Sequence, residues 1–335
     1  MDKYKSKIDV SVLIIFFNRP GCLEKVFEQI KIARPSKLFL YQDGARENNE
    51  NDVVGIKKCR EIVSDIDWDC EVHTLYQEKN YGCDPSGYLA RKWAFESTNK
   101  CIILEDDCVP SQSLFPFCKE LLDKYESDER INMICCMNNL ETWDTPYSYL
   151  FTETGSICGV ATWKRIIDEW DPGYSFLDDE YNKRLLIKYM DSKKPSCINS
   201  LGAWENERDT GLEFHEAIGG ITQLANSRLN IVTAQNLISN VGNTPEGGTH
   251  SVSDVSLLPR NIRKIFTMPS YELEFPLVHP PYVINDVDFQ SALYRLMGTG
   301  HPFIKLKMRI SRAFLILSKQ GFKSLMNKLM KKLGR

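Results

Sequence analysis

The sequence has no long hydrophobic run. Residues 10–17 form an apolar stretch with one serine inside it, and no stretch reaches the roughly 18 apolar residues that cross a bilayer as a helix. The first stretch is also not followed by a small-residue cleavage site. We therefore expect a cytoplasmic protein with neither a transmembrane helix nor a removable leader.

Histidine is scarce, and paired cysteines are missing. The chain has five histidines, and no two of its eleven cysteines are spaced as the CxxC pair of common zinc sites. Several cysteines, such as Cys101 and Cys135, lie inside apolar stretches. We therefore expect reduced thiols buried in the core rather than a disulfide framework.

The last 35 residues contain no acidic residue. They hold ten of the 42 basic residues, which leaves 32 basic against all 45 acidic residues in the rest of the chain. The overall net charge of −3 argues against a general nucleic-acid binder, so we expect no nucleic-acid partner. In 304–334, apolar residues recur at three- and four-residue steps between the charges. This pattern predicts basic amphipathic helices on an anionic membrane surface, and a helix docked on the acidic body is the alternative.

The first 140 residues alternate between two hydrophobic patterns. Continuous apolar runs predict strands at 10–17, 37–41, 70–76, 101–105 and 131–136. Helix-like spacing predicts helices at 21–33, 52–66, 85–97 and 113–126. Strands that alternate with helices over short links predict an α/β fold, with a mainly parallel sheet covered by helices on both faces. In such sheets, ligands bind beyond the carboxyl ends of the strands.

Three consecutive carboxylates, Glu105, Asp106 and Asp107, follow the fourth predicted strand. Adjacent like charges repel one another and resist desolvation, so either water or a positive group must lie among them. Carboxylate oxygens suit Mg²⁺ and Mn²⁺, which also bridge to phosphate oxygens. The position favours a site for such an ion, and a solvated acidic turn that caps the next helix is the alternative.

The segment IILEDDCVPSQSLF around these carboxylates resembles the metal-binding DxD segment of GT-A glycosyltransferases. It is most similar to the EDD form in N-acetylglucosaminyltransferase I and its bacterial relatives. Further segments match in the same order over about residues 10–252: FNRP, YQDGARE, GVATWKR with AWENE, and NLISNVGNTPEGGTHS. The resemblance implies a GT-A, Rossmann-like α/β fold with a less regular acceptor-side lobe.

The resemblance implies a metal site at the acidic segment. Asp107 would coordinate Mn²⁺ or Mg²⁺, and Glu105 and Asp106 would contact the donor sugar, the ribose or waters on the metal. His250, in the glycine-rich stretch 246–250, would complete the metal shell or contact the diphosphate. An exposed loop histidine is the alternative at that position.

The resemblance also implies a nucleotide pocket. Asp43 would accept a hydrogen bond from the uracil ring, and Asn18 and Arg19 would line the pocket, where Arg19 offers a planar fork to base or phosphate. A plain turn at Asp43 and a surface ion pair at Arg19 are the alternatives.

A transfer with inversion needs a carboxylate that accepts the proton of the acceptor hydroxyl. The resemblance places this base in Trp204-Glu205-Asn206-Glu207, where Glu205 is the first choice and Glu207 the second. The segment departs from the usual aspartate of the family. The acidic cluster at 178–180 is a rival, although a solvated helix start explains it better.

Together these features predict a metal-dependent glycosyltransferase. Residues 1–140 would bind a UDP-sugar, residues 141–255 would bind the acceptor and catalyse, and residues 256–335 would form a basic C-terminal extension. The acceptor would be a glycan or a lipid-linked sugar in bacterial cell-surface polysaccharide synthesis, with the enzyme peripheral at the inner face of the plasma membrane.

Two other functions remain open from the sequence. A nucleotidyltransferase could use a similar sheet and acidic metal site, but it usually has a glycine-rich phosphate loop and an early lysine where this chain has NRPG. A non-catalytic sugar-nucleotide or glycan-binding protein would bind the donor without any turnover.

Overall fold

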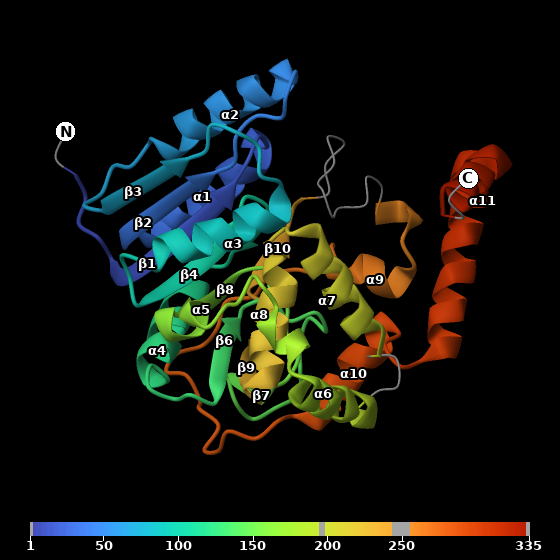
Figure 1. Ribbon diagram of the computed structural model, residues 1–335. Helices are drawn as coiled ribbons and strands as arrows, with labels where there is room; N and C mark the ends of the chain where they lie inside the picture. The colour runs from blue at the N-terminus through green and yellow to red at the C-terminus, as the bar shows by residue number, and fades with distance from the viewer. Residues whose placement is uncertain (1–2, 194–197, 243–254, 333–335) are drawn as a thin grey trace.

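An eight-stranded mixed sheet forms the centre of the protein (Figure 1). The computed structural model describes residues 3–193, 198–242 and 255–332. From one edge to the other the strands are β3 (Glu71–Tyr76), β2 (Pro35–Gln42), β1 (Ile8–Phe16), β4 (Lys100–Glu105), β8 (Val160–Trp163), β6 (Ile131–Cys135), β9 (Leu229–Thr233) and β7 (Tyr149–Thr152). A second, two-stranded sheet pairs β5 (Cys108–Pro110) with β10 (Ile238–Asn240).

Helices cover both faces of the large sheet. They are α1 (Pro20–Ala33), α2 (Glu50–Val63), α3 (Cys83–Ala94), α4 (Leu114–Lys124), α5 (Lys164–Asp168), α6 (Glu180–Lys193), α7 (Ile198–Thr210), α8 (His215–Ala225), α9 (Arg260–Ile265), α10 (Val287–Met297) and α11 (Pro302–Lys332), with short 3₁₀ turns η1 (Ser175–Asp178) and η3 (Val255–Leu257). Side chains of α1, α2 and α4 form one core, and side chains of α3, α5, α8 and α10 form the other.

The apolar pattern of each element explains why it packs where it does. In α1, Leu23, Val26, Phe27 and Ile30 are buried because three- and four-residue steps place them on one side of the helix. Burial of each such side chain contributes about 1.5–3 kcal/mol. In β1, the side chains alternate between the two cores, since successive residues of a strand point to opposite faces.

The α/β class and the mainly parallel sheet are confirmed. Strand β1 pairs in parallel with both β2 and β4, and β6 pairs in parallel with β9. Strands β8 and β7 run against their neighbours, so the sheet is mixed. Since β7, β8 and β9 continue the sheet that β1–β4 begin, the second half of the chain adds to the same body. The division at residues 140 and 255 stays a prediction.

The described residues also show the state of the cysteines and whether a helix could cross a membrane. All ten cysteines in the described ranges are free, and seven of them are buried, as expected from the sequence. Cys197 lies outside these ranges. Within them, no helix combines the length and the hydrophobicity that a membrane-crossing segment needs.

Candidate functional site

The acidic segment lies at the carboxyl edge of the sheet, where β1 and β4 end side by side. Glu105 is the last residue of β4 and stands opposite Ile15 of β1. The backbone N–H of Asp106 donates to the carbonyl of Ile15 over 3.1 Å, which extends the pairing by one residue. Asp107 then turns the chain into β5. The three carboxylates are therefore held at the edge by backbone pairing, as the sequence predicted.

Arg19 supplies the positive charge among these carboxylates. Its guanidinium donates to both carboxylate oxygens of the buried Asp106, and its Nη2 lies 3.0 Å from Oδ2 of Asp107. Pro20 starts α1 immediately after Arg19, so the end of β1 fixes the arginine at this edge. The structure thus shows Arg19 in an ion pair, but the partner is the acidic segment itself and the guanidinium is mostly buried.

One arginine does not offset three carboxylates. Burial raises the pKa of Glu105 to about 7, and the charge of Asp107 adds to the rise. Burial also raises the pKa of Asp106, while Arg19 opposes that rise. Arg91 also lowers the pKa of Glu105, whereas Glu216 raises it. Four carboxyl groups thus face two guanidinium groups, and a further cation would lower the energy of the ionised carboxyl groups.

The donor set fits a hard divalent ion. Oxygens of Glu105 and Asp107 and the sulfur of Cys108 lie within 4.8 Å of one another. The Cys108 thiol interacts with Cys158 and is buried, and both effects raise its pKa well above its usual range. Sulfur is also a soft ligand that Mg²⁺ and Mn²⁺ do not favour. That leaves the two carboxylates. Mg²⁺ and Mn²⁺ are commonly held by one or two carboxylates together with phosphate oxygens.

The strand β10 closes the acidic segment from the other side. Asn240 pairs with Cys108, and the N–H of Val241 donates to the carbonyl of Asp107 over 2.8 Å. Gly242 follows so closely that a Cβ atom there would overlap the carboxylate of Asp107. Within the matched segment 236–251, residues 240–242 therefore lie against the acidic segment. His250 lies outside the described residues, so its role stays a prediction.

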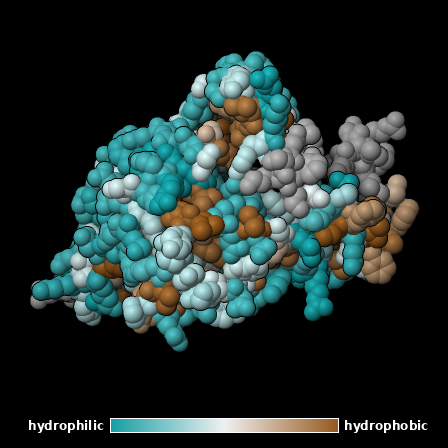
Figure 2. All heavy atoms as spheres, turned by 90° about the horizontal axis from the view of Figure 1, so that it is seen from below, coloured by the Kyte–Doolittle hydropathy of each residue, from teal (hydrophilic) through white to brown (hydrophobic). Residues whose placement is uncertain are grey.

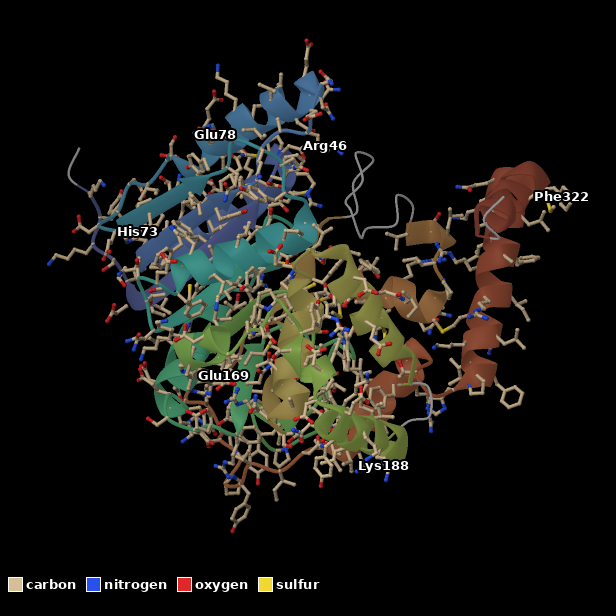
Figure 3. The ribbon with its side chains drawn as sticks, in the orientation of Figure 1. Arg46, His73, Glu78, Glu169, Lys188 and Phe322 are labelled. Carbon is tan, nitrogen blue, oxygen red and sulfur yellow. The ribbon has the colours of Figure 1, made fainter. Side chains whose placement is uncertain are left out.

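Asn18 belongs to a polar cluster beside the end of β1. Its amide donates to Oδ1 of the buried Asp52 over 2.6 Å, and the guanidinium of Arg46 binds both oxygens of Asp52 at 2.7 Å. These hydrogen bonds, that of Arg46 above all, lower the pKa of Asp52. Arg46 also stacks over the ring of Phe17, and Figure 3 shows it at the end of the molecule near α2. Sequence reasoning missed Asp52 because it lies outside the matched segments. It missed Arg46 because only Asp43 was given a role within the matched segment YQDGARE.

Asp43 is buried at the end of β2 and anchors a neighbouring loop. Its Oδ1 accepts hydrogen bonds from the N–H groups of Gly44 and Tyr81, and its Oδ2 accepts from the side chain of Asn80 and the N–H of Gly82. The four distances are 2.8–3.0 Å. Both oxygens are therefore engaged within the chain, which gives Asp43 a structural role, and its contact with a base stays a prediction.

The two candidate bases occupy different environments on α7. Glu205 is partly exposed, and its carboxylate lies 3.3 Å from Nζ of Lys183. Glu207 is half-buried beside Tyr174, and burial, Asp84 and Glu216 raise its pKa. The described ion pair of Glu205 is with Lys183 of α6, not with the acidic segment. Both assignments stay predictions.

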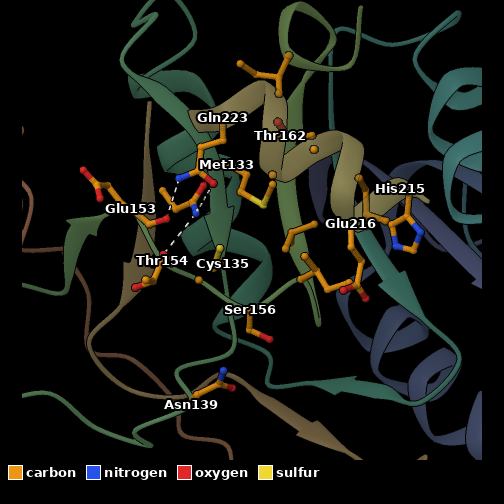
Figure 4. Close-up of a pocket in the computed structure, with 18 of the residues that line it drawn as sticks. Met133, Cys135, Asn139, Glu153, Thr154, Ser156, Thr162, His215, Glu216 and Gln223 are labelled. Atoms are coloured by element: carbon orange, nitrogen blue, oxygen red, sulfur yellow. Dashed lines mark hydrogen bonds between the residues drawn. The ribbon is translucent and has the colours of Figure 1, made fainter. Parts of the chain in front are cut away.

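A cavity of about 380 Å³ lies on the α3–α8 side of the sheet. In Figure 4, His215 and Glu216 stand at one end, Glu153, Thr154 and Gln223 at the other. Strand residues such as Ile103, Cys135 and Val160 form its floor, and Trp170 adds an aromatic wall. Carboxylates, amides, hydroxyls and an aromatic ring together suit a polyhydroxylated ligand.

Arg91 and Glu216 connect this cavity to the acidic segment. Both line it, and both interact electrostatically with Glu105. Arg91 is buried and donates through Nη1 to the carbonyl of Gly87 over 2.8 Å. Gly87 has no room for a side chain because His215 packs against it, so α3 and α8 approach closely. Sequence reasoning also missed Glu216 as a functional candidate. It lies 111 positions after Glu105, and no motif around it indicates that the two residues are close in the fold.

Comparison with known proteins found no matching family model and no matching curated protein. Some solved structures are similar to parts of this chain. They include a UDP-glucose pyrophosphorylase complexed with UDP-glucose (10% identity, 69% of this chain and 92% of that chain, TM-score 0.35). They also include a 4-diphosphocytidyl-2C-methyl-D-erythritol synthase from Anaerococcus prevotii (12% identity, 48% of this chain and 74% of that chain, TM-score 0.29). A third is an inositol-1-phosphate CTP transferase from T. maritima (8% identity, 48% of this chain and 73% of that chain, TM-score 0.30). Likeness at this level assigns neither a family nor an activity to the chain.

Proposed function

We propose that this chain is a metal-dependent glycosyltransferase that moves a hexosyl or N-acetylhexosaminyl group from a UDP-sugar to a glycan or lipid-linked acceptor, with inversion. The observation that carries the proposal is the position of Glu105, Asp106 and Asp107 at the carboxyl edge of β4, between Arg19, β10 and the cavity. The order of matched segments in the sequence supports the same reading.

The residues at the carboxyl edge of the sheet would have different roles in binding a sugar nucleotide. Asp107 and Glu105 would hold a Mg²⁺ or Mn²⁺ ion, which stabilises negative charge on a diphosphate leaving group. Arg19 orients Asp106 and Asp107 through its two ion pairs. Asn18 and Arg46 would line the nucleotide side of the edge.

Glu216 is our candidate for the general base. It lies in the cavity wall, and it is near enough to Glu105 to influence the pKa of that residue. An acceptor hydroxyl bound in the cavity would therefore meet a carboxylate near the acidic segment, as proton removal during attack requires. Glu207 is the second candidate because it interacts with Glu216.

The start of α1 disfavours the nucleotidyltransferase alternative. The N–H groups of Cys22 and Leu23 both donate to the carbonyl of Arg19, at 3.2 and 3.1 Å, and only residues 17–19 separate the strand from the helix. No glycine-rich loop of free N–H groups separates the two elements, and such a loop is what cradles a triphosphate.

A ligand screen with a turnover assay tests the proposed function. Thermal unfolding is followed with UDP, other nucleoside diphosphates and UDP-sugars, each with and without Mn²⁺. A ligand at 100 times its Kd should stabilise the fold by about 2.7 kcal/mol. We expect manganese-dependent stabilisation by uridine ligands and slow release of UDP from one UDP-sugar. Stabilisation without any turnover would favour the binding-protein alternative, and turnover of a nucleoside triphosphate with a sugar phosphate would favour the nucleotidyltransferase.

Replacing Glu216 with glutamine should lower turnover about 100-fold while donor binding stays intact. Glutamine keeps the shape of the side chain but cannot accept a proton, and general bases typically contribute 10²–10⁴-fold. The measurement is the rate of UDP release with saturating donor, beside the manganese-dependent shift in unfolding temperature.

Glu205→Gln is the matched control because Glu205 is partly exposed and paired with Lys183. Normal turnover in Glu216→Gln together with a large loss in Glu205→Gln would return the base to the position that the resemblance first indicated. A large loss in Glu207→Gln alone would move it to the second candidate.

A further inference from the structure

The C-terminal helix α11 carries an apolar stripe that is exposed to solvent. Its members have 42–84% of their surface exposed: Phe303, Leu306, Ile310, Phe314 and Leu317. At about 100° per residue, these three- and four-residue steps place the stripe within an arc of roughly 80° on one side of the helix. Figure 2 shows apolar atoms at the side of the molecule where Figure 1 places α11.

The body of the protein holds the opposite side of this helix. Ile316 is buried, Lys305 and Met308 lie against Gly298, and the helix contacts η3. The stripe consequently points away from the body. Gly321 has a left-handed φ of 79° that kinks the helix after the stripe, and Phe322 beyond it also points outward (Figure 3).

The charges around the stripe are all of one sign. The described basic side chains of this helix are exposed: Lys305, Lys307, Arg309, Arg312 and Lys319. None of the five forms an ion pair with another described residue. The alternative, a terminal helix docked on the acidic body with its lysines solvated, accounts for these exposed charges but not for the exposed apolar stripe. At about 100° per residue, Lys307 and Arg309 flank the stripe, and the other three lie on the opposite side of the helix. That distance is about one helix diameter, ~10 Å, which is close to the Debye length in physiological salt.

We propose that α11 docks on the surface of an anionic lipid bilayer, with the stripe inserted at the boundary between headgroups and acyl chains. A membrane surface satisfies both features at once, because it takes up apolar side chains along a line and attracts cations around that line. Nucleic acid would use the charges but leave the apolar stripe in water. A second copy would bring two basic helices together. The proposal does not depend on the transferase activity.

Co-sedimentation of the full chain with vesicles tests this docking. Vesicles of phosphatidylcholine alone are compared with vesicles that contain about 30% phosphatidylglycerol, at 0.15 M and 0.5 M NaCl. We expect binding to the anionic vesicles that weakens in high salt. The stripe variant Phe303→Ser/Ile310→Ser/Phe314→Ser should bind at least about tenfold less. The charge variant Lys307→Gln/Arg309→Gln should lose about fivefold per charge, on the order of 25-fold in total.

The matched control is Val53→Ser/Val54→Ser in α2, which removes two exposed apolar side chains from a distant helix. It should bind like the wild type, and every variant should keep the wild-type circular dichroism and ligand stabilisation. A wild-type chain that stays in the supernatant overturns the proposal, and so does an equal loss in the control. Normal vesicle binding by the stripe variant, with a change from dimer to monomer in light scattering, would show that the stripe binds a second copy instead. Binding to DNA or RNA that the stripe variant retains, without vesicle binding, would likewise overturn it.

Discussion

Asp107→Ala should abolish the manganese-dependent part of donor stabilisation and lower turnover at least about 100-fold. Asp107 offers one of the two carboxylates of the metal pair, and transition-state charge stabilisation of this kind is worth at least 10²-fold. Arg19 keeps its bonds to Asp106 in the variant, so the end of β4 should stay folded. The measurements are unfolding temperature with UDP, with and without Mn²⁺, and the rate of UDP release.

Gly242→Ala is a second substitution that should disturb the carboxylate of Asp107, from the side of β10. The added methyl group would displace the Asp107 side chain, because it would overlap that carboxylate. We expect nearly normal stability without ligand but a lost manganese response. Gly21→Ala is the matched control, since nothing lies within 4 Å of a Cβ at that position. An Asp107→Ala protein that responds to Mn²⁺ like the wild type would refute the metal assignment.

Asp43→Ala should destabilise the fold by about 3–5 kcal/mol, one of the largest stability effects available at the sheet edge. The substitution would leave four donors from residues 44 and 80–82 without their acceptor, and unsatisfied buried groups cost about 1–3 kcal/mol each before relaxation. The unfolding temperature should fall by on the order of 10 °C. Urea unfolding of the ligand-free protein measures the change.

Asp43→Asn separates the structural role from the expected contact with uracil. Asparagine keeps one acceptor oxygen, so we expect a smaller stability loss with unchanged preference for uridine over other nucleotides. Asp69→Ala is the control, because Asp69 is an exposed aspartate just before β3, at the opposite edge of the sheet from Asp43. A stable Asp43→Asn protein that no longer prefers uridine would show that Asp43 reads the base.

Local patterns in the sequence predicted the elements that build the site. The predicted strands at 10–17 and 101–105 are β1 and β4, and the predicted helix at 21–33 is α1. These assignments succeeded because side-chain periodicity is a local property of a strand or helix. The short strands after residue 140 have at most five residues each, and too few positions repeat in them for a pattern to emerge.

The partners of the predicted residues could not be read in the same way. The sequence indicated that a positive group or water must lie among the carboxylates, yet it offered no way to choose Arg19, which is 87 positions from Asp106. Likewise, the overlap of Gly242 with Asp107 arises only because β10 pairs with β5. Contacts between distant positions depend on which strands become neighbours, and that is a property of the whole sheet.

The sequence by itself determined the acidic segment, its place after a buried strand and the basic, apolar character of the C-terminal helix. The tertiary structure alone decided that Arg19 neutralises part of the acidic charge, that Glu216 shares a cavity with Arg91, and that the stripe of α11 faces away from the body. The reason is physical: backbone pattern is encoded over a few residues, whereas charge compensation and exposure depend on how separate segments pack together.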